Sequence, residues 1–213
     1  MFPPATEADD NDVVGVGADL EPGTLLLAYR NGLFPMPISR SGLMGWWSPD
    51  PRGIFEIDDI RVGRTLRRSA RRFTTTVDRS FDQVVTRCAE LPRPGGWITP
   101  EIRDAYGELH RLGWAHSVEV RLDDELVGGL YGVCLGGVFA GESMFHTETD
   151  ASKVALWALR DLLDDGYPRI VDAQWLTPHL ESLGARAIDR REYLVRLRQG
   201  LTVPFPAGFQ RRD

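Results

Sequence analysis

The sequence predicts an α+β or mixed α/β fold, in which helices pack on a sheet. Three strand-like segments follow one another between residues 116 and 145, separated by the acidic turn 123–125 and by Gly136-Gly137, as in an antiparallel meander. A helical segment from about Ala151 to Asp165 comes next, and a further strand, RIVDAQW, comes after it. Strands followed by a helix and another strand indicate one layered domain.

The segments before the meander predict a smaller N-terminal unit. The first dozen residues are polar and carry prolines, so we expect them to be disordered or loosely docked. Residues 24–34, TLLLAYRNGLF, have apolar residues at helical spacing and end near Asn31-Gly32, a C-cap signal. The stretch up to Arg52 is rich in Pro, Gly and Trp and predicts loop, and GIFEID then predicts a short strand.

A domain boundary is expected near residue 60, which gives an N-terminal domain, 1–60, and a larger domain, 61–213. Beyond the boundary, an arginine-bearing helix leads to the strand FTTTV. Helices then follow from about Phe81 to Glu90 and from Pro100 to Leu112, before the meander begins.

Composition and charge argue against several classes of protein. The formal net charge of −6 argues weakly against nucleic acid as a partner. No apolar run approaches the roughly 18 residues that span a bilayer, and the first residues do not resemble a secretory leader, so we expect a cytoplasmic protein. Cys88 and Cys134 are expected to be reduced core thiols. No spacing typical of a metal site, a phosphate-binding loop or a serine elbow is present, so neither a metal nor a cofactor is predicted.

One arginine-rich segment contrasts with the acidic total. RVGRTLRRSARRFTTTVDR, residues 61–79, carries seven arginines and one acid, Asp78. A solvated helix face accounts for this pattern, and so does a patch that binds phosphate groups. The pattern alone leaves both interpretations open.

Several polar and aromatic residues stand out as candidates for a site. Glu142 follows the run GVFAG, which is typical of a buried strand, and a buried carboxylate costs several kcal/mol unless it has partners. Asp172 and Gln174 are two apart in RIVDAQW, so the period of two puts both side chains on one face, either a shared polar site or the exposed face of an edge strand. Trp47 and Trp97 lie in Pro/Gly-rich segments and either fill a domain seam or stack on a base.

A series of ordered motifs resembles a known family. The motifs are LLLAYRNGLFPM, WWSPDPRGIF, FDQVVTRCAE, GGWIT, AYGELHRLGWAHSVEV, LVGGLYGV, GESMF, DASKVAL, VDAQ and HLESLGA. From about residue 14 to residue 195, the chain resembles the bacterial leucyl/phenylalanyl-tRNA–protein transferases. The resemblance implies transfer of Leu or Phe, and less readily Met, from aminoacyl-tRNA to the N-terminal Arg or Lys of a protein, which marks that protein for N-degron-dependent degradation. It also refines the fold class to α+β, with a small N-terminal domain and a larger acetyltransferase-like (GNAT-type) mixed-sheet domain.

The resemblance also implies the site residues. Glu142, Asp172 and Gln174 are expected at the catalytic centre: Asp172 orients or polarises Gln174, Gln174 helps to activate the incoming amine and to stabilise the tetrahedral intermediate, and Glu142 holds the amine or the aminoacyl group. A substrate-assisted version, in which these residues only orient the substrates, stays open. The terminal adenosine is expected to contact Trp47 and Trp97. The expected pocket for the amino-acid side chain is Phe139, Met144, Leu156, Leu159 and Val171, and the expected tRNA contacts are Arg67, Arg68, Arg71 and Arg72.

The chain departs from the family pattern in places. GESMFHT stands where GESMFSR is usual, FPM where FPW is usual, and Ala173 where Cys or Thr is common. Leu159 and Leu163 occupy positions where larger aromatic residues occur, which leaves the size of the pocket and the preference between Leu and Phe open.

Two other functions account for part of the pattern. A CoA-dependent N-acetyltransferase has a similar fold, but its glycine-rich cofactor loop is missing where GESMFHTETDASK enters its helix. A non-enzymatic module that binds RNA or basic N-termini needs basic and aromatic surfaces, but it gives no reason for Glu142, Asp172 and Gln174 together.

Overall fold

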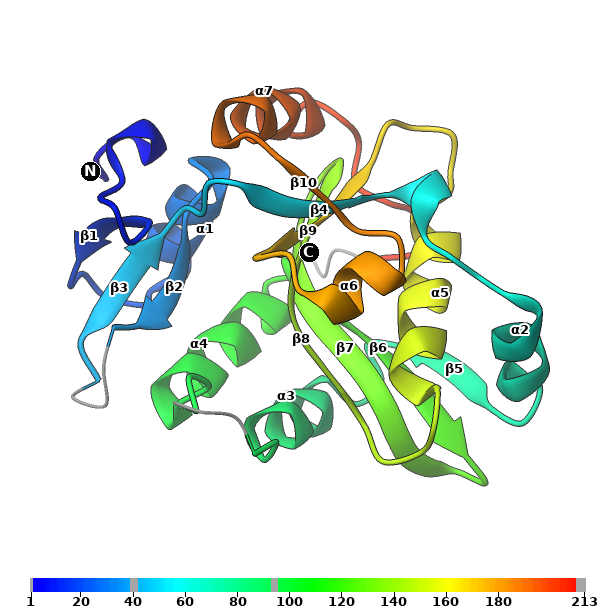
Figure 1. Ribbon diagram of the computed structural model, residues 1–213. Coiled ribbons are helices and arrows are strands. Elements are labelled where there is room, and N and C mark those ends of the chain that lie inside the picture. Colours follow the sequence, from blue (N-terminus) through cyan, green and yellow to red (C-terminus); the bar gives the residue numbers. More distant parts are fainter. Residues whose placement is uncertain (1, 39–41, 93–95, 210–213) are drawn as a thin grey trace.

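A computed structural model describes residues 2–38, 42–92 and 96–209 of the chain (Figure 1). Its strands form a three-stranded sheet of order β1-β3-β2 and a seven-stranded sheet of order β10-β4-β9-β8-β7-β6-β5. The predicted α+β architecture, with a small N-terminal unit beside a large mixed sheet, is confirmed. Gly95, the first glycine of the GGWIT motif, lies outside the described residues.

The N-terminal unit holds one helix and a small antiparallel sheet. Helix α1 (Pro22–Arg30) begins with a proline and is capped at Asn31, as predicted. The loop predicted before Arg52 is wrong, because this stretch forms β2 (Phe34–Pro37) and β3 (Met44–Trp47), which pair antiparallel with each other. Since β2 is an edge strand, its two prolines are tolerated there, and this is why the composition suggested a loop.

The first dozen residues are docked on this unit, so the prediction of a loose leader is wrong. A short 3₁₀ turn, η1 (Ala5–Glu7), buries Ala5, and the ring of Phe2 packs against Trp46 at 4.7 Å between centroids. Asp12 accepts a hydrogen bond from Arg190, and strand β1 (Val13–Val16) pairs with β3. Specific contacts that composition does not reveal thus hold the leader in place.

The large sheet contains the predicted meander. Its strands are β4 (Arg52–Glu56), β5 (Thr74–Val77), β6 (Ala115–Leu122), β7 (Glu125–Leu135), β8 (Val138–His146), β9 (Ile170–Gln174) and β10 (Arg186–Ile188). Strands β6, β7 and β8 form the meander, and each pairs antiparallel with the next. Strand β9 joins β8 in parallel after a helical crossover, which makes the sheet mixed.

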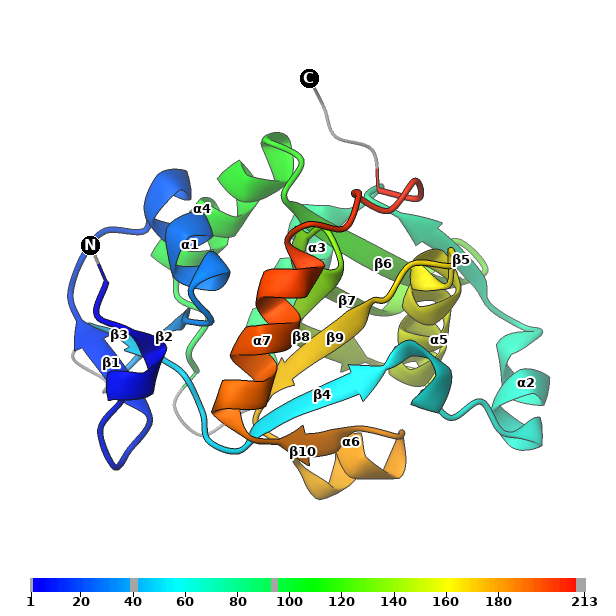
Figure 2. The same cartoon turned by 90° about the horizontal axis from the view of Figure 1, so that it is seen from above.

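Helices cover both faces of the large sheet (Figures 1 and 2). They are α2 (Arg64–Ala70), α3 (Phe81–Ala89), α4 (Pro100–Arg111), α5 (Ala151–Leu163), α6 (Pro178–Ser182) and α7 (Arg190–Gly200), with a 3₁₀ turn, η2 (Ile57–Asp59), after β4. The apolar residues of α2, α5 and α6 pack in one cluster on one face, whereas α1, α3, α4 and α7 cover the opposite face. Within the described residues, no helix combines the length and the apolar character needed to cross a membrane.

The N-terminal unit and the large sheet share a hydrophobic core. Leu25 and Tyr29 of α1 belong to the same buried cluster as Tyr106 of α4 and Phe145 of β8. Strand β4 is part of the seven-stranded sheet although it precedes residue 60. We therefore propose to draw the domain boundary between β3 and β4.

Candidate active site

Two irregularities of the sheet form the site. In the β7–β8 pair, Tyr131 faces Ser143 while the adjacent Gly132 faces Gly141, so Glu142 is the extra residue of a bulge. The β4–β9 pair has a similar shift, which leaves Ala173 as the extra residue. Bulges re-aim side chains and recur beside active sites. Here they direct side chains from β8 and β9 into the space between these two strands, which pair from Val138–Ile170 to Ala140–Asp172.

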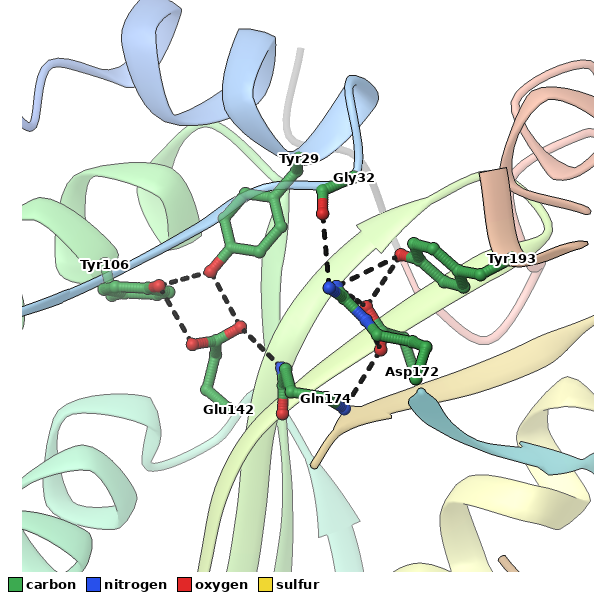
Figure 3. Close-up of polar contacts among 8 residues, drawn as sticks. Tyr29, Gly32, Tyr106, Glu142, Asp172, Gln174 and Tyr193 are labelled. Carbon is green, nitrogen blue, oxygen red and sulfur yellow. Dashed lines mark hydrogen bonds and ion pairs between the residues drawn. The ribbon is translucent and has the colours of Figure 1, made fainter. Parts of the chain in front are cut away.

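The Asp172 carboxylate is enclosed by hydrogen-bond donors from distant parts of the chain (Figure 3). Arg52 of β4 donates from Nε to Oδ1 at 2.8 Å and from Nη2 to Oδ2 at 2.7 Å. Tyr193 of α7 donates to Oδ2 at 2.7 Å, and the backbone N–H of Gln174 donates to Oδ1 at 3.0 Å. Both side chains of the ion pair are 1% exposed. Burial acts to lower the pKa of Arg52, but Asp172 and Tyr193 together outweigh it, so this pKa lies above its ordinary value.

Glu142 has a different set of partners. Tyr29 of α1 donates to Oε1 at 2.7 Å and Tyr106 of α4 donates to Oε2 at 3.0 Å, and the two phenol oxygens also contact each other. Figure 3 shows both rings pointing toward the carboxyl group.

This arrangement governs the proton affinity of the site. Burial raises the pKa of Glu142 to about 7, although the hydrogen bonds from Tyr29 and Tyr106 act to lower it. Burial, together with the charge of Glu142, raises the pKa of both tyrosines well above the ordinary value, so the phenols remain donors. The result is a carboxyl group that exchanges its proton near neutral pH.

Gln174 connects the two carboxyl groups. Its side-chain amide donates to Glu142 Oε1 at 3.5 Å, while its backbone N–H donates to Asp172. The backbone of Gln174 has a φ of 58°, in the left-handed region that costs a non-glycine residue about 1–3 kcal/mol. The expected contact between Asp172 and Gln174 therefore runs through the main chain of Gln174, and the bulge at Ala173 breaks the period of two on which the sequence argument rested.

An apolar cavity of about 270 Å³ lies on one side of Glu142 and Gln174. It is lined by β8, β9, α5 and α6, with Phe55 of β4 and Leu130 of β7. The structure brings together in this cavity all five residues expected for the side-chain pocket: Phe139, Met144, Leu156, Leu159 and Val171. Phe55, Leu130 and Leu180 line it as well, although the sequence did not single them out.

A second cavity, of about 140 Å³, lies toward the N-terminal unit and is also lined by Glu142 and Gln174. Trp97 lines it, together with Trp175, which sequence reasoning missed. Trp47 lies behind Trp175 and is not among the lining residues. Its ring packs edge-on against Trp175 at 5.8 Å between centroids, and its indole N–H donates to the carbonyl of Met36. The structure thus places Trp97 at the cavity and Trp47 as its support.

The four arginines expected to contact tRNA are exposed on α2 and directly after it: Arg67, Arg68, Arg71 and Arg72. Arg67 lies over the ring of Trp157 at 5.2 Å. Arg72 forms an ion pair with Glu148 at 2.8 Å. Helix α2 packs against α5, which also lines the apolar cavity, so the arginines and the cavity share one supporting helix.

Sequence reasoning missed four residues that hold the carboxyl groups: Tyr29, Arg52, Tyr106 and Tyr193. The first three lie inside the motifs LLLAYRNGLFPM, WWSPDPRGIF and AYGELHRLGWAHSVEV, which carried the resemblance without a role for these positions. A signal was available, because a carboxylate on a buried strand needs a cation or several donors. Nothing in the sequence showed which arginine or tyrosine supplies them.

Comparison with known proteins identifies the family. The leucyl/phenylalanyl-tRNA protein transferase profile matches residues 54–198, and the profile of that family's N-terminal domain matches residues 18–50. The chain belongs to this family. A leucyl/phenylalanyl-tRNA–protein transferase from Syntrophobacter fumaroxidans is 48% identical, over 94% of this chain and 88% of the relative. One from Shewanella denitrificans is 45% identical, over 93% of this chain and 86% of the relative.

Solved structures resemble the chain more remotely. A GCN5-related N-acetyltransferase from Kribbella flavida has a TM-score of 0.42 and 13% identity, over 78% of this chain and 60% of that one. L-PGS from Bacillus licheniformis has a TM-score of 0.43 and 14% identity, over 74% of this chain and 52% of that one. These values are too low to support an inference from either neighbour.

Proposed function

We propose that the protein moves Leu or Phe, and less readily Met, from aminoacyl-tRNA to the N-terminal Arg or Lys of an acceptor protein. The product serves as a degradation signal in the N-degron pathway, and the reaction takes place in the cytoplasm. Membership of the family supports the reaction class. The observation that carries the proposal is the position of Glu142 and Gln174 between an apolar cavity and an aromatic one.

The two cavities suit the two ends of an aminoacyl ester. An apolar cavity of about 150 Å³ is enough to bind benzene, so the cavity of about 270 Å³ has room for a phenyl ring or a leucyl side chain. The second cavity, with Trp97 and Trp175, offers aromatic faces for the terminal adenosine. The ester carbonyl then lies between the cavities, beside Glu142 and Gln174.

The reaction is aminolysis of an ester. The incoming ammonium group first releases one proton to solvent, and the neutral amine then attacks. Its nitrogen bonds to the carbonyl carbon, the bond from that carbon to the ribose oxygen breaks, and a second proton moves from the nitrogen to the ribose oxygen. An α-amino group has a pKa of about 8, and a general base works best when its pKa lies near the working pH. With a pKa of about 7, Glu142 takes the second proton from the attacking nitrogen and passes it to the ribose oxygen as that bond breaks.

Gln174 stabilises the charge that develops on the carbonyl oxygen. One amide hydrogen points at Glu142, and the amide carries a second hydrogen that is available to the substrate. A preorganised donor of this kind contributes about 3–4 kcal/mol to the transition state. No covalent intermediate is needed, because an ester is already activated toward an amine.

The arginines of the α2 segment supply affinity for the tRNA. Contacts to phosphate groups bind without reading the base sequence, which suits an enzyme that accepts several tRNA isoacceptors. Selection among amino acids falls to the apolar cavity, where a difference of one methylene changes the free energy by about 1–3 kcal/mol. Leu, Phe and Met are therefore expected to react to graded extents.

Transfer of label tests this function. The protein is incubated without CoA with tRNA charged with labelled Leu, Phe or Met and with a peptide that begins with Arg; a peptide that begins with Asp is the control acceptor. We expect label on the first peptide only, with Leu and Phe ahead of Met. Gln174→Ala is expected to lose about 100-fold in rate, whereas Gln83→Ala, an exposed glutamine on α3, is expected to react like the wild type.

Each alternative gives a different result. Acetylation of the peptide when acetyl-CoA replaces charged tRNA, without any aminoacyl transfer, supports a CoA-dependent N-acetyltransferase and contradicts the proposal. Binding of tRNA or peptide without either reaction supports a binding module and contradicts it as well.

A further inference from the structure

We propose that Arg52 and Tyr193 are positioning residues that act on Gln174 through Asp172, and that Asp172 serves as a structural acceptor and takes no part in proton transfer. This inference rests on the proposed function for its kinetic test. The observation behind it is the set of donors around the Asp172 carboxylate, which come from β4, β9 and α7.

The Asp172 carboxylate is saturated. An ionised carboxylate offers about four acceptor positions, and in this structure Oδ1 accepts from Arg52 Nε and the Gln174 backbone, while Oδ2 accepts from Arg52 Nη2 and Tyr193. Its side chain is 1% exposed. No position is left for an ammonium group or for the side-chain amide of Gln174.

Among the hydrogen bonds to Asp172, the one from the Gln174 backbone N–H connects it to the proposed catalytic centre. Gln174 has a φ of 58°, which an L residue adopts only when its surroundings hold it there. The Asp172 Oδ1 contact at 3.0 Å fixes the N–H of this residue, and the side chain then reaches Glu142. Asp172 thus sets the backbone that aims Gln174.

Arg52 and Tyr193 set the position of Asp172 in turn. The fork of Arg52 fixes both oxygens of the carboxylate, and its remaining nitrogen, Nη1, donates to the carbonyl of Gly32 at 3.2 Å. The ring of Tyr193 lies against the guanidinium group at 4.3 Å. Figure 3 shows this chain of contacts running from Gly32 and Tyr193 to Asp172 and on to Gln174. The segment after α1, helix α7 and strand β4 are therefore all tied to the catalytic amide.

A matched control lies directly before β9. Arg169 is also buried, forks onto Asp165 at 2.7 Å for both contacts and donates to a glycine carbonyl, that of Gly136. These two hydrogen-bond partners, Asp165 and Gly136, line neither of the two cavities beside Glu142. Loss of its fork therefore reports the cost of disturbing a buried arginine without disturbing Gln174.

The test combines Tyr193→Phe, Arg52→Lys and Arg169→Lys with the wild type and with the Gln174→Ala background. Single-turnover transfer is measured at saturating charged tRNA and peptide. Tyr193→Phe is expected to slow transfer about tenfold, the size of one hydrogen bond to a charged group, with little change in KM for either substrate. Arg52→Lys is expected to slow it at least as much, and Arg169→Lys to leave the rate unchanged.

Comparison of each substitution in the wild type and in the Gln174→Ala background separates a positioning role from a general loss of structure. Residues that act as a unit are non-additive, so in Gln174→Ala the further loss from Tyr193→Phe or Arg52→Lys is expected to shrink to less than about twofold. An equal loss in both backgrounds, or a wild-type rate for Tyr193→Phe, overturns the proposal. If Arg52→Lys does not fold, the comparison of Tyr193→Phe in the two backgrounds still tests the proposal, because this substitution keeps the ring and removes one hydroxyl.

A second measurement is independent of activity. Hydrogen exchange of the backbone N–H of Gln174, followed by NMR, is expected to be slow in the wild type and in Arg169→Lys and faster in Tyr193→Phe. Failure of the wild type to transfer any amino acid refutes the proposed function and leaves this measurement valid. An unchanged exchange rate in Tyr193→Phe refutes the positioning role whatever the reaction is.

Discussion

Two buried arginines each form a two-pronged ion pair with an aspartate: Arg52 with Asp172, in the middle of β9, and Arg169 with Asp165, in the segment between α5 and β9. Each guanidinium group also donates to the carbonyl of a glycine, Gly32 or Gly136. Arg169 pairs with Asp165, four residues away, whereas Arg52 pairs with Asp172, which is 120 residues away. The first pair closes a local turn, and the second ties together remote segments of the chain.

Their surroundings differ as much as their spacing. The side chain of Asp165 is 27% exposed, so water solvates part of it, and the hydrogen bond from Arg169 holds its pKa below the ordinary value. The side chain of Asp172 is 1% exposed, and protein donors fill its acceptor positions. The Arg169–Asp165 pair thus links nearby residues beside solvent, whereas the Arg52–Asp172 pair supports the site from inside the protein.

Removal of each cation is the strongest test of this difference. Arg52→Met leaves a buried carboxylate without its partner, which costs about 3–5 kcal/mol of folding free energy. Arg169→Met leaves a carboxylate that water can reach, so its cost is expected to be about 2 kcal/mol, the size of one or two hydrogen bonds to a charged group. Urea unfolding of both variants, with transfer rates measured below the unfolding transition, checks both expectations.

The pattern of activities completes this test. We expect transfer to be nearly abolished in folded Arg52→Met and retained in folded Arg169→Met. Equal losses of stability, or equal rates, would show that the two pairs do the same job and that the position of Asp172 beside Gln174 has no consequence.

Glu142 extends the comparison to a carboxyl group that has phenols in place of an arginine. Its pKa is raised by burial from 4.5 to about 7, so the folded protein holds this proton more tightly than the unfolded chain does. The stability of the wild type relative to Glu142→Gln is therefore expected to be greatest at low pH and to fall as the pH rises from about 4.5 to about 7. Unfolding free energies of both proteins between pH 4 and pH 8 measure this difference.

A tyrosine variant sharpens the result. The hydrogen bond from Tyr106 lowers the pKa of Glu142, so Tyr106→Phe is expected to move the rise in transfer rate with pH to higher pH. If the difference in stability between the wild type and Glu142→Gln does not vary with pH, Glu142 has the same pKa in the folded protein as in the unfolded chain.

The parts of this site that sequence could predict are those with local signals. The C-cap at Asn31, the meander and the arginine-rich helix all follow from residue spacing. The five residues that line one cavity were expected from the family resemblance and not from any local pattern. The bulges at Glu142 and Ala173 could not be predicted, because register depends on the neighbouring strand. The donors could not be predicted either, since Tyr29 and Glu142 lie 113 residues apart and meet only through the packing of α1 on the sheet.

The exposed arginines give the smallest effect on folding and complete the comparison of arginine environments. Substitution of Gln for Arg68 and Arg71 removes charges that are already solvated, so the folding free energy is expected to change by less than about 0.5 kcal/mol. Arg67→Gln also removes the contact with the ring of Trp157 and is expected to cost about 0.5–1 kcal/mol. Affinity for tRNA is expected to fall, and the slope of log affinity against log salt is expected to flatten by about one for each phosphate group that is no longer neutralised. Arg72→Gln is expected to flatten the slope less, because Glu148 already neutralises part of that charge at 2.8 Å. Titration of tRNA binding at several salt concentrations gives the slopes, and Arg191→Gln on the exposed side of α7 is the control. A slope that stays the same after all the α2-segment substitutions would mean that these arginines form a solvated helix face and bind no phosphate.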